Sequence, residues 1–304
     1  MNIAIDDRRV RYFFEAVTCG SVRAAADKLD MNPSVVSRQI AQLESELVVT
    51  LMERLGRGVK ATEAGQILID YYRQHRSHQD DVVTKIQELR GLKDGHIDLV
   101  LGEGFVGDLM GPPIQEFWGR YPGLSITMNL AGTNDVLRQV SEDLAHIGLV
   151  YNPFPSKNIR SRAAVRQPLC AIMPPGHPLT RQKTRPKLSE ICDCPVALMH
   201  GSYGTRQLIA MAEQMDQIRL VPRLMTDSIS ILKHFVRAGL GIGLLPEFSV
   251  TQEIHAGELI ALEVDHPILS NAEAHIVTRL GRQLPIAANQ LLIHLISSMQ
   301  AFRK

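Results

Sequence analysis

The side chains best suited to recognition chemistry lie in residues 33–47, a segment whose spacing predicts a helix. Val36, Ile40 and Leu43 recur at intervals of three and four, which places them on one buried face. At about 100° per residue, Ser34 and Arg38 fall on the opposite face. The residues beside them are Val35, Ser37, Gln39 and Gln42. Arginine can bind guanine, an amide can bind adenine and a small apolar group can meet the thymine methyl, so this face suits the DNA major groove. A solvated face of an ordinary helix bundle is an equally weighted alternative.

A second group of candidate residues is cationic and follows closely in the sequence. Residues 51–61 form two short extended runs around Gly56-Arg57-Gly58, which predicts a β-hairpin. Arg54, Arg57 and Lys60 lie in this hairpin, with no acid between Arg54 and Lys60. Cations on a hairpin beside such a helix suit the phosphate backbone or the minor groove and shift the balance toward DNA. The alternative is a solubilising surface turn.

Several motifs that suggest enzyme or metal chemistry fail on their spacing. The string His200-Gly201-Ser202-Tyr203-Gly204 resembles a nucleophile elbow, but that motif needs a glycine two positions before the serine. The glycines of 239–243 precede a strand instead of opening a helix, so they do not form a dinucleotide loop. Cys192 and Cys194 lack a second ligand pair for zinc. We therefore predict no catalytic residue and no metal site. Ordinary half-buried thiols are favoured over a redox switch.

Composition places the chain among ordinary globular proteins. Its 304 residues carry 33 lysines and arginines against 32 acids, with 45% hydrophobic and 21% charged residues. This excludes collagen-like, disordered and disulfide-stabilised chains, and the length predicts at least two domains. No apolar run reaches the roughly 20 residues of a membrane span, the start lacks a secretory signal pattern and the four cysteines are scattered. We therefore expect a cytoplasmic protein without a membrane partner.

The elements that must position these residues are mostly helical up to residue 92. Apolar spacing predicts a helix over 10–17, a second over 22–29 and a third capped by Asn32, which is a helix-turn-helix pattern. Residues 62–63 open a helix that runs to about residue 92, roughly 42 Å long. Its imperfect apolar stripe predicts a partner helix, most simply from a second subunit. The stripe consists of Leu68, Tyr71, His75, Val82, Ile86 and Leu89.

Beyond a predicted hinge at 91–95, strands and helices alternate to the end of the chain. This pattern indicates α/β architecture with βαβ units. The expected strands are 97–101, 125–130, 147–151, 169–173, 196–199, 223–226, 242–245 and 275–278, and a helix over 284–302 closes the chain.

The ordered motifs of residues 9–65 resemble the winged helix-turn-helix of the LysR-type transcriptional regulators. The motifs are Phe13-Phe14-Glu15-Ala16-Val17, Gly20-Ser21, Ala24-Ala25-Ala26-Asp27-Lys28-Leu29, Pro33-Ser34-Val35-Val36-Ser37-Arg38-Gln39-Ile40, Gln42-Leu43-Glu44, Glu53-Arg54, Gly56-Arg57-Gly58-Val59 and Thr62-Glu63-Ala64-Gly65. No single motif is specific, but their order is. One departure is Val48-Val49-Thr50, which replaces the usual glycine-containing turn before the wing.

The resemblance implies a fold that is α/β overall. It consists of an all-α winged helix-turn-helix over 1–62, a linker and dimerisation helix over 63–92, and a two-lobed α/β effector domain over 93–304. The effector domain is similar to type 2 periplasmic solute-binding proteins. The first lobe would comprise about 95–165 and 265–304, and the second about 166–264.

The resemblance also implies which residues approach DNA. They are Asn32, Ser34, Val35, Ser37, Arg38, Gln39, Arg54, Arg57 and Lys60. Residues 1–60 contain nine lysines and arginines and eight acids, so the basic strip is confined to Arg38 and the hairpin. So few cations predict weak non-specific binding, with useful affinity coming from dimerisation and base contacts.

For the second half, the resemblance implies a small-molecule co-inducer between the lobes and no other cofactor. Ligands of open α/β sheets bind at the carboxyl ends of strands, where helix N-termini offer N–H donors. The candidate residues are Phe105, Thr133, Asn134, Asn152, Ser202, Tyr203 and Thr226. For each Thr, Ser or Asn, simple helix capping is at least as well supported. A small organic anion fits helix N-termini, while a neutral or aromatic effector stays open.

We therefore predict a regulator without enzyme activity that binds a specific double-stranded DNA operator. We expect a homodimer through the linker helix. Because members of the resembled family commonly form homotetramers, we expect a homotetramer as well. Contact with RNA polymerase stays open. Two alternatives are an α/β enzyme and a solute-binding protein, each with an N-terminal helical interaction domain. The sequence does not identify the effector, the operator, the target genes or the direction of regulation.

Overall fold

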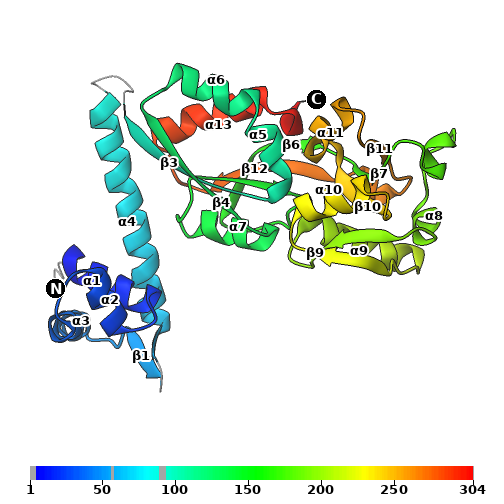
Figure 1. Cartoon of the computed structure of the whole chain (residues 1–304). Helices are drawn as coiled ribbons and strands as arrows, with labels where there is room; N and C mark the ends of the chain where they lie inside the picture. The colour runs from blue at the N-terminus through cyan, green and yellow to red at the C-terminus, as the bar shows by residue number, and fades with distance from the viewer. Residues whose placement is uncertain (1–4, 56–57, 89–93, 304) are drawn as a thin grey trace. The chain divides into compact units, whose positions relative to one another are not determined.

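Two compact units make up the protein, Met1–Val82 and Val83–Lys304. The structure is a computed structural model, and it describes residues 5–55, 58–88 and 94–303 (Figure 1). The first unit is helical with a small hairpin, and the second contains two five-stranded sheets. The expected α/β fold class, with an N-terminal helix-turn-helix, is confirmed. None of the described helices is long and apolar enough to cross a membrane.

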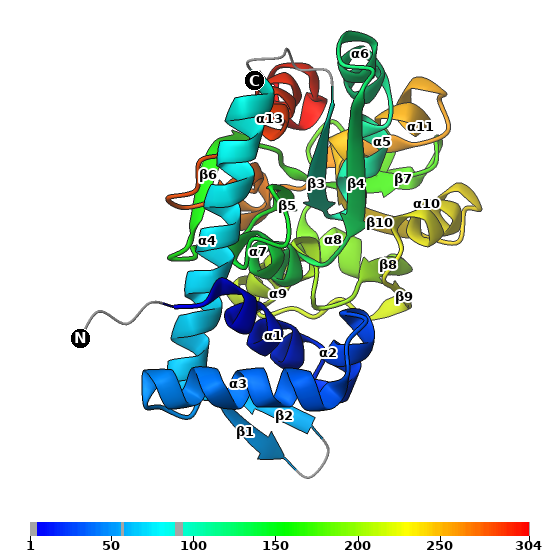
Figure 2. The same cartoon turned by 90° about the vertical axis from the view of Figure 1, so that its left-hand side faces the viewer.

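Three short helices form the core of the first unit (Figure 2). They are α1 (Asp7–Thr18), α2 (Val22–Lys28) and α3 (Pro33–Leu47). Each begins with a side chain that accepts a hydrogen bond from a backbone N–H of the first turn, and these N-caps are Asp6, Ser21 and Asn32. The buried side chains include Val10, Phe13, Ala25, Ala26, Val36, Ile40 and Leu43. The apolar spacing that predicted the helices therefore also sets which faces meet.

The hairpin consists of antiparallel strands β1 (Met52–Leu55) and β2 (Gly58–Ala61). Two contacts fix its place on the helices. The Val59 N–H donates to the Gly20 carbonyl at 2.9 Å, and the Glu44 carboxylate accepts from the Leu51 N–H at 2.7 Å. Just before the hairpin, Val48 ends α3 in the left-handed conformation, with φ of 55°. A β-branched residue rarely adopts this conformation, so the backbone is strained at Val48. This is the turn in which the sequence analysis noted the absence of a glycine.

Helix α4 (Glu63–Glu88) follows the hairpin. Its first turn is capped by the Thr62 hydroxyl, which accepts from the Gly65 N–H at 3.0 Å. Leu68 and Tyr72 are buried in the core of the first unit, and the rings of Tyr72 and Phe14 lie 5.1 Å apart. The expected end of this helix near residue 92 lies outside the described residues.

The second unit contains two lobes, each built on a mixed sheet (Figure 1). The sheet of lobe I has the order β4-β3-β5-β12-β6 and that of lobe II the order β11-β7-β10-β8-β9. The strands of lobe I are β3 (Gly95–Leu101), β4 (Leu124–Leu130), β5 (Ile147–Tyr151), β6 (Ile159–Arg166) and β12 (Glu273–Arg279). Those of lobe II are β7 (Leu169–Met173), β8 (Val196–Met199), β9 (Pro222–Thr226), β10 (Ile242–Pro246) and β11 (Ile260–Glu263). The chain passes between the lobes after β6 and again after β11.

Short helices connect these strands. Lobe I carries η1 (Glu103–Phe105), α5 (Val106–Leu109), α6 (Pro112–Arg120), α7 (Thr133–Ser141), α13 (Ile286–Ser298) and η4 (Gln300–Phe302). Lobe II carries η2 (Pro178–Arg181), α8 (Leu188–Cys192), α9 (Gly204–Asp216), α10 (Ile229–Arg237), η3 (Glu247–Ser249) and α11 (Thr251–His255). Helix α12 (Pro267–Ser270) lies in the second crossover. In β3, β4 and β5, which run parallel, the carboxyl ends point toward the segments that open η1 and α7.

All eight predicted strands are present, but the sequence missed β6 and β11. Both are edge strands of their sheets. Strand β6 carries Arg160, Arg162 and Arg166 on a largely exposed face, which hides the usual apolar signal. Strand β11 has four residues, all of them half-buried. Edge strands bury little side-chain surface, so their hydropathy resembles that of a loop.

Candidate functional site

The face of α3 that the sequence proposed for DNA is open. Ser34, Arg38 and Gln42 are exposed, whereas Val35 and Ser37 are half-buried beside them. Within the described part of the chain, the Arg38 guanidinium has no hydrogen bond or ion pair. An unpaired guanidinium with five donors on an exposed helix face is available for a guanine edge or a phosphate. The DNA contacts of these residues stay a prediction.

Two of the proposed DNA-contact residues are engaged inside the protein. The Asn32 side-chain oxygen accepts from the Ser34 N–H at 3.0 Å and from the Ser34 hydroxyl at 2.8 Å. The Gln39 side-chain oxygen accepts from Arg9 Nε at 3.1 Å. Arg9 also pairs with Glu46 near the end of α3. Asn32 and Gln39 therefore position α3, and Gln39 ties it to α1.

In the described part of the hairpin, the cation Lys60 lies beside an acid. Lys60 is exposed, but the strand register places it directly opposite Glu53, which is also exposed. Arg57 and the side chain of Arg54 lie outside the described residues. Glu53 precedes Arg54 and is seven residues from Lys60 in the sequence. Only the pairing of β1 with β2 brings Glu53 beside Lys60. Glu44, which holds Leu51 in place, is a positioning residue that the spacing arguments missed.

In the second unit, candidate residues from the two lobes contact one another. The Thr133 hydroxyl of lobe I accepts from the Gly204 N–H of lobe II at 3.0 Å. Both residues are buried. The N-cap of α7 is Gly132 and has no side-chain cap bond, so simple capping is wrong for Thr133. A Cβ added at Gly204 would lie 2.0 Å from the Tyr151 carbonyl oxygen. Close approach of lobe I thus requires glycine at the start of α9.

The N-terminus of α10 is also occupied from the other lobe. Glu103 of η1 accepts from the Ile229 N–H at 2.6 Å, the Ser230 N–H at 3.1 Å and the Ser228 hydroxyl at 3.1 Å. In the sequence analysis, Phe105 of the same segment, η1, was proposed as a ligand contact. The structure shows instead that the acid of this segment takes one of the helix N-termini that a ligand anion would use.

The remaining candidates fall into three environments. Phe105 is buried, with its ring 4.9 Å from that of Phe248, so it is a core residue and not a candidate ligand contact. Thr226 is buried too, and its hydroxyl accepts from the Ser228 N–H at 3.1 Å. The Tyr203 hydroxyl donates to the Asp227 carbonyl at 2.8 Å. Burial raises the pKa of Tyr203, and the nearby charges of Glu103 and Asp227 raise it further.

Three candidate side chains make no hydrogen bond to another described residue and stay available. Asn134 and Ser202 are exposed near the junction of the lobes, and Asn152 is half-buried after β5 with φ of 47°. Gly132 lies against Ser202, because a Cβ on this glycine would meet the Ser202 carbonyl oxygen at 2.9 Å. Ser202 thus lies at the contact between Thr133 and Gly204, and Asn134 and Asn152 directly follow Thr133 and Tyr151, which take part in it.

The first turns of α9 hold polar atoms that lack partners. The Thr205 hydroxyl and the Gln207 side-chain oxygen are buried, and neither has a hydrogen-bond partner among the described residues. Buried polar atoms without partners are uncommon in folded proteins, so such a pair at a helix N-terminus marks a place for a ligand or water. Thr205 was not selected in the sequence analysis. Its signal was a hydroxyl one position after a glycine that opens a helix.

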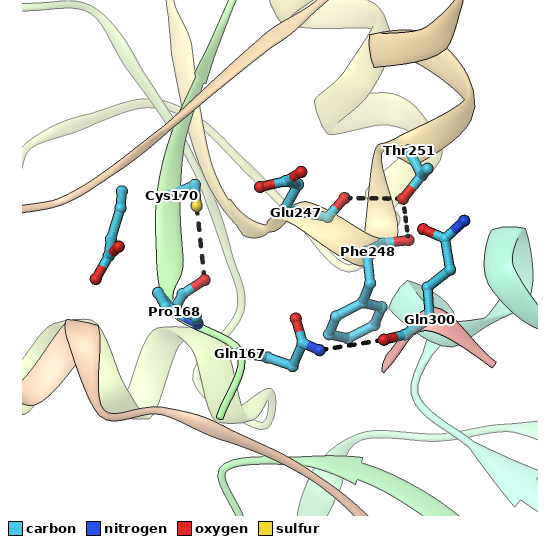
Figure 3. Close-up of a pocket in the computed structure, with 8 residues that line it drawn as sticks. Gln167, Pro168, Cys170, Glu247, Phe248, Thr251 and Gln300 are labelled. Carbon is cyan, nitrogen blue, oxygen red and sulfur yellow. Dashed lines mark hydrogen bonds between the residues drawn. The ribbon is translucent and has the colours of Figure 1, made fainter. Parts of the chain in front are cut away.

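A separate cavity of about 350 Å³ lies beside the first crossover (Figure 3). Its lining residues are Gln167, Pro168, Cys170, Glu247, Phe248, Thr251, Glu263 and Gln300, none of which is cationic. Two of the lining residues are hydrogen-bonded to each other, because the Gln167 amide donates to the Gln300 carbonyl at 3.3 Å. Burial, followed by the charges of Glu247 and Glu263, raises the pKa of the Cys170 thiol to about 12. Cys170 therefore stays a neutral thiol, and the cavity is distinct from the residues predicted for the cleft.

The pKa values of the Cys192 and Cys194 thiols are raised as well. Burial is the largest cause that raises the pKa of Cys192 and of Cys194, and the charge of Asp193 adds to it. Both are free cysteines. A raised pKa suppresses the thiolate that reacts with oxidants, which supports ordinary half-buried thiols. Across the described residues, no group of three or more His, Cys, Asp or Glu side chains is placed to hold a metal ion.

Comparison with known families gives matches over most of the chain. Residues 8–66 match the family described as bacterial regulatory helix-turn-helix protein, lysR family. Residues 71–300 match the family described as LysR substrate binding domain. Among curated proteins, the chain is 29% identical over 285 residues to the HTH-type transcriptional activator CmpR of Synechocystis. That alignment covers 93% of this chain and 92% of CmpR.

Solved structures agree with the fold. Full-length OxyR from Pseudomonas aeruginosa is similar with a TM-score of 0.72 and 17% identity, covering 98% of this chain and 96% of OxyR. Full-length CbnR in complex with its target DNA is similar with a TM-score of 0.59 and 16% identity, covering 96% of this chain and 99% of CbnR. At these identities the likeness concerns the arrangement of the backbone.

Proposed function

The chain belongs to the LysR family of bacterial transcriptional regulators, and we propose that α3 reads its operator while α9 binds the effector. As a member of this family it is a DNA-binding transcriptional regulator and not an enzyme. The residues that perform each task, the chemistry of the effector and the assembly are our proposals. A bacterial regulator works where the chromosome is, so the proposal includes a cytoplasmic location.

The observation that carries the DNA-reading proposal is the open face of α3. Arg38 projects from it without an internal partner in the described chain, between exposed Ser34 and Gln42. In contrast, Gln39 is held by Arg9. We therefore assign base reading to Arg38, with Ser34, Val35 and Ser37 as its neighbours, and assign Asn32 and Gln39 to support. Lys60 contacts the phosphate backbone in this proposal.

A gel-shift series with the promoter region of the protein's own or a neighbouring gene tests this assignment. Arg38→Ala is expected to weaken specific binding by about 1–3 kcal/mol and to relax the preference at one operator position. Lys60→Ala is expected to weaken specific and random DNA alike and to flatten the salt dependence by about one charge. Arg120→Ala removes an exposed cation from α6 and is the matched control. Wild-type affinities of Arg38→Ala for both specific and random DNA would reject the proposal.

For the effector we propose a small organic anion at the first turn of α9. The unpartnered Thr205 hydroxyl and the positive end of the α9 dipole support this place. Ser202, Tyr203, Asn134 and Asn152 surround it, while Thr133 orients Gly204. A thermal-shift screen of small carboxylates on the full chain should yield a hit that raises Tm. Thr205→Val and Ser202→Ala should reduce the shift, whereas Ser297→Ala, a change on α13, should leave it unchanged.

We also propose that the protein is a homodimer through α4 and forms a homotetramer. Ile67, Tyr71 and Val82 are apolar and exposed, at 69%, 37% and 55% respectively. At about 100° per residue they fall within roughly 60° of one another around the helix. Such a stripe is unusual on a helix that faces only water. Light scattering of wild type and of Ile67→Lys with Val82→Lys should show loss of the dimer in the variant. Contact with RNA polymerase stays an open part of the proposal.

A further inference from the structure

Glu103 of lobe I forms hydrogen bonds to a helix of lobe II. It lies in η1, directly after β3 of lobe I, while its three donors all belong to the start of α10 in lobe II. The two backbone N–H donors, from Ile229 and Ser230, are groups that the helix itself leaves without partners. The third donor is the hydroxyl of Ser228, the N-cap. A single carboxylate thus accepts from the first two backbone N–H groups of α10 and from the N-cap hydroxyl, which itself accepts from the Ile231 N–H at 3.4 Å.

This arrangement is the one that a bound anion adopts at a helix N-terminus. The N–H groups converge on the ligand, and the helix dipole favours its negative charge. Here the anion is covalently part of lobe I. Glu103 also acts on Tyr203. Burial is the largest cause of the raised pKa of Tyr203, and the charge of Glu103 raises it further.

The neighbouring residues seat the Glu103 segment against lobe II. A Cβ on Gly104 would lie 3.3 Å from the Ile229 side chain, so this glycine allows close approach. The Gln252 amide of lobe II donates to the Gly107 carbonyl at 3.1 Å. The contact of Glu103 is therefore the centre of a wider interface between the lobes.

We propose that Glu103 is an internal substitute for a ligand's acidic group, which excludes external anions from α10 and fastens lobe I to lobe II. This proposal rests on the proposed effector site between the lobes and specifies which ligands that site accepts. With the N-terminus of α10 filled, the acidic group of an effector is directed away from α10 and toward α9, where the Thr205 hydroxyl has no partner among the described residues. The cleft accordingly selects effectors with one acidic group over dianions that would span both helices.

Chemical rescue of a truncated Glu103 tests the proposal. The full chain contains one tryptophan, Trp118 on α6, so its fluorescence reports unfolding of the second unit. Glu103→Ala should lower the Tm followed by this signal by about 4–8 °C, because a charged acceptor with three donors is lost. Potassium acetate should restore at least half of that loss, relative to potassium chloride at equal ionic strength. Acetate should not shift the Tm of wild type.

Two variants provide the controls. Glu116→Ala removes an exposed acid from α6, and acetate should have no effect on it beyond chloride. Glu103→Gln keeps the side-chain volume without the charge, so it should lower Tm but resist rescue because the site is filled. The proposal fails if Glu103→Ala melts like wild type. It also fails if acetate shifts Glu103→Ala no more than Glu116→Ala.

The same variants separate this proposal from the regulatory function. Gel shifts without effector should show that Glu103→Ala still binds promoter DNA, because Glu103 lies outside the first unit. Loss of rescue with DNA binding intact rejects only the role of Glu103. Rescue in a chain whose wild type binds no promoter DNA rejects the regulatory function and leaves the role of Glu103 standing.

Discussion

The exposed face of α3 and the contact between the two lobes use polar side chains in opposite ways. Arg38 and Ser34 come from neighbouring turns of one helix, and the Arg38 guanidinium has no partner in the described chain. In the cleft, Thr133 and Gly204 are 71 residues apart in sequence and are bonded to each other. Glu103 reaches a helix that begins 126 residues later. The first surface is complete within one helix, whereas the second exists only when two lobes meet.

This difference indicates how each surface responds to change. A substitution on the exposed face of α3 should leave the fold largely intact, and in our proposal it removes a contact to DNA. A substitution in the cleft removes a bond that holds the lobes together, so stability and ligand response change at once. The effector domain should therefore be sensitive at a few buried polar positions, and the following tests run from the largest expected effect to the smallest.

Gly204→Ala should have the largest effect. Its Cβ would collide with the Tyr151 carbonyl, a backbone atom that cannot move without shifting β5. We expect a loss of about 3 kcal/mol or more in the stability of the second unit, measured by urea unfolding with Trp118 fluorescence. Gly201→Ala is the matched control, because a Cβ there meets nothing within 4 Å. Equal stabilities of the two variants would show that the lobes are not held closely at this point.

Acid should have the second-largest effect, through His146 of lobe I. Burial first, and then the charge of Arg282, lowers its pKa from 6.5 to about 4. Above pH 6.5 this histidine is neutral in both the folded and the unfolded chain, so it contributes nothing to pH dependence. Below pH 6.5 the unfolded chain takes up the proton first. Stability should therefore fall as the pH drops toward 4, by about 3 kcal/mol from this group.

His146→Asn is the test of that pH dependence. The His146 ring nitrogen Nδ1 accepts from the Asp98 N–H at 2.9 Å, and an asparagine oxygen can accept the same bond. The variant should lose less stability than wild type between pH 7 and pH 4, as followed by Trp118 fluorescence. Identical losses would mean that other groups cause the acid sensitivity.

Thr133→Val should have an intermediate effect. It would leave the buried Gly204 N–H without an acceptor, at an expected loss of about 1–2 kcal/mol. Thr133→Ser keeps the oxygen and should retain most of the stability. Asn134→Ala, at the exposed neighbouring position, should lose little. If Thr133→Val were as stable as Thr133→Ser, the hydroxyl would not join the lobes.

Val48→Gly should have the smallest effect, and it should be stabilising. Val48 has φ of 55° and ψ of 38°, where glycine avoids a steric cost of about 1–2 kcal/mol. The greater flexibility of unfolded glycine offsets part of this, so a gain of about 0.5–1 kcal/mol in the first unit is expected. Circular dichroism of the helices during heating measures it, with Val49→Gly as the control. A loss of stability in Val48→Gly would show that its side chain makes contacts worth more than the strain.

Much of the first unit could be predicted because its information is local. Apolar spacing sets the rotation of each helix, and Ser21 and Asn32 cap helices a few residues away. The role of Gln39 was missed because its partner, Arg9, lies on another helix. Likewise, Glu53 faces Lys60 only through strand register. Edge strands β6 and β11 were missed because little of their surface is buried.

For the chain as a whole, the sequence alone determined the family, the fold class, the alternation of strands and helices, and the exposed face of α3. These follow from periodicity, capping and motif order, which act over a few residues. The tertiary structure decided which candidate groups remain free. It showed that Thr133 and Glu103 are bonded to the opposite lobe, that Phe105 belongs to the core, and that Thr205 lacks a partner among the described residues. Hydrogen bonds across the cleft depend on how two sheets pack, and no short-range pattern in the sequence encodes that packing.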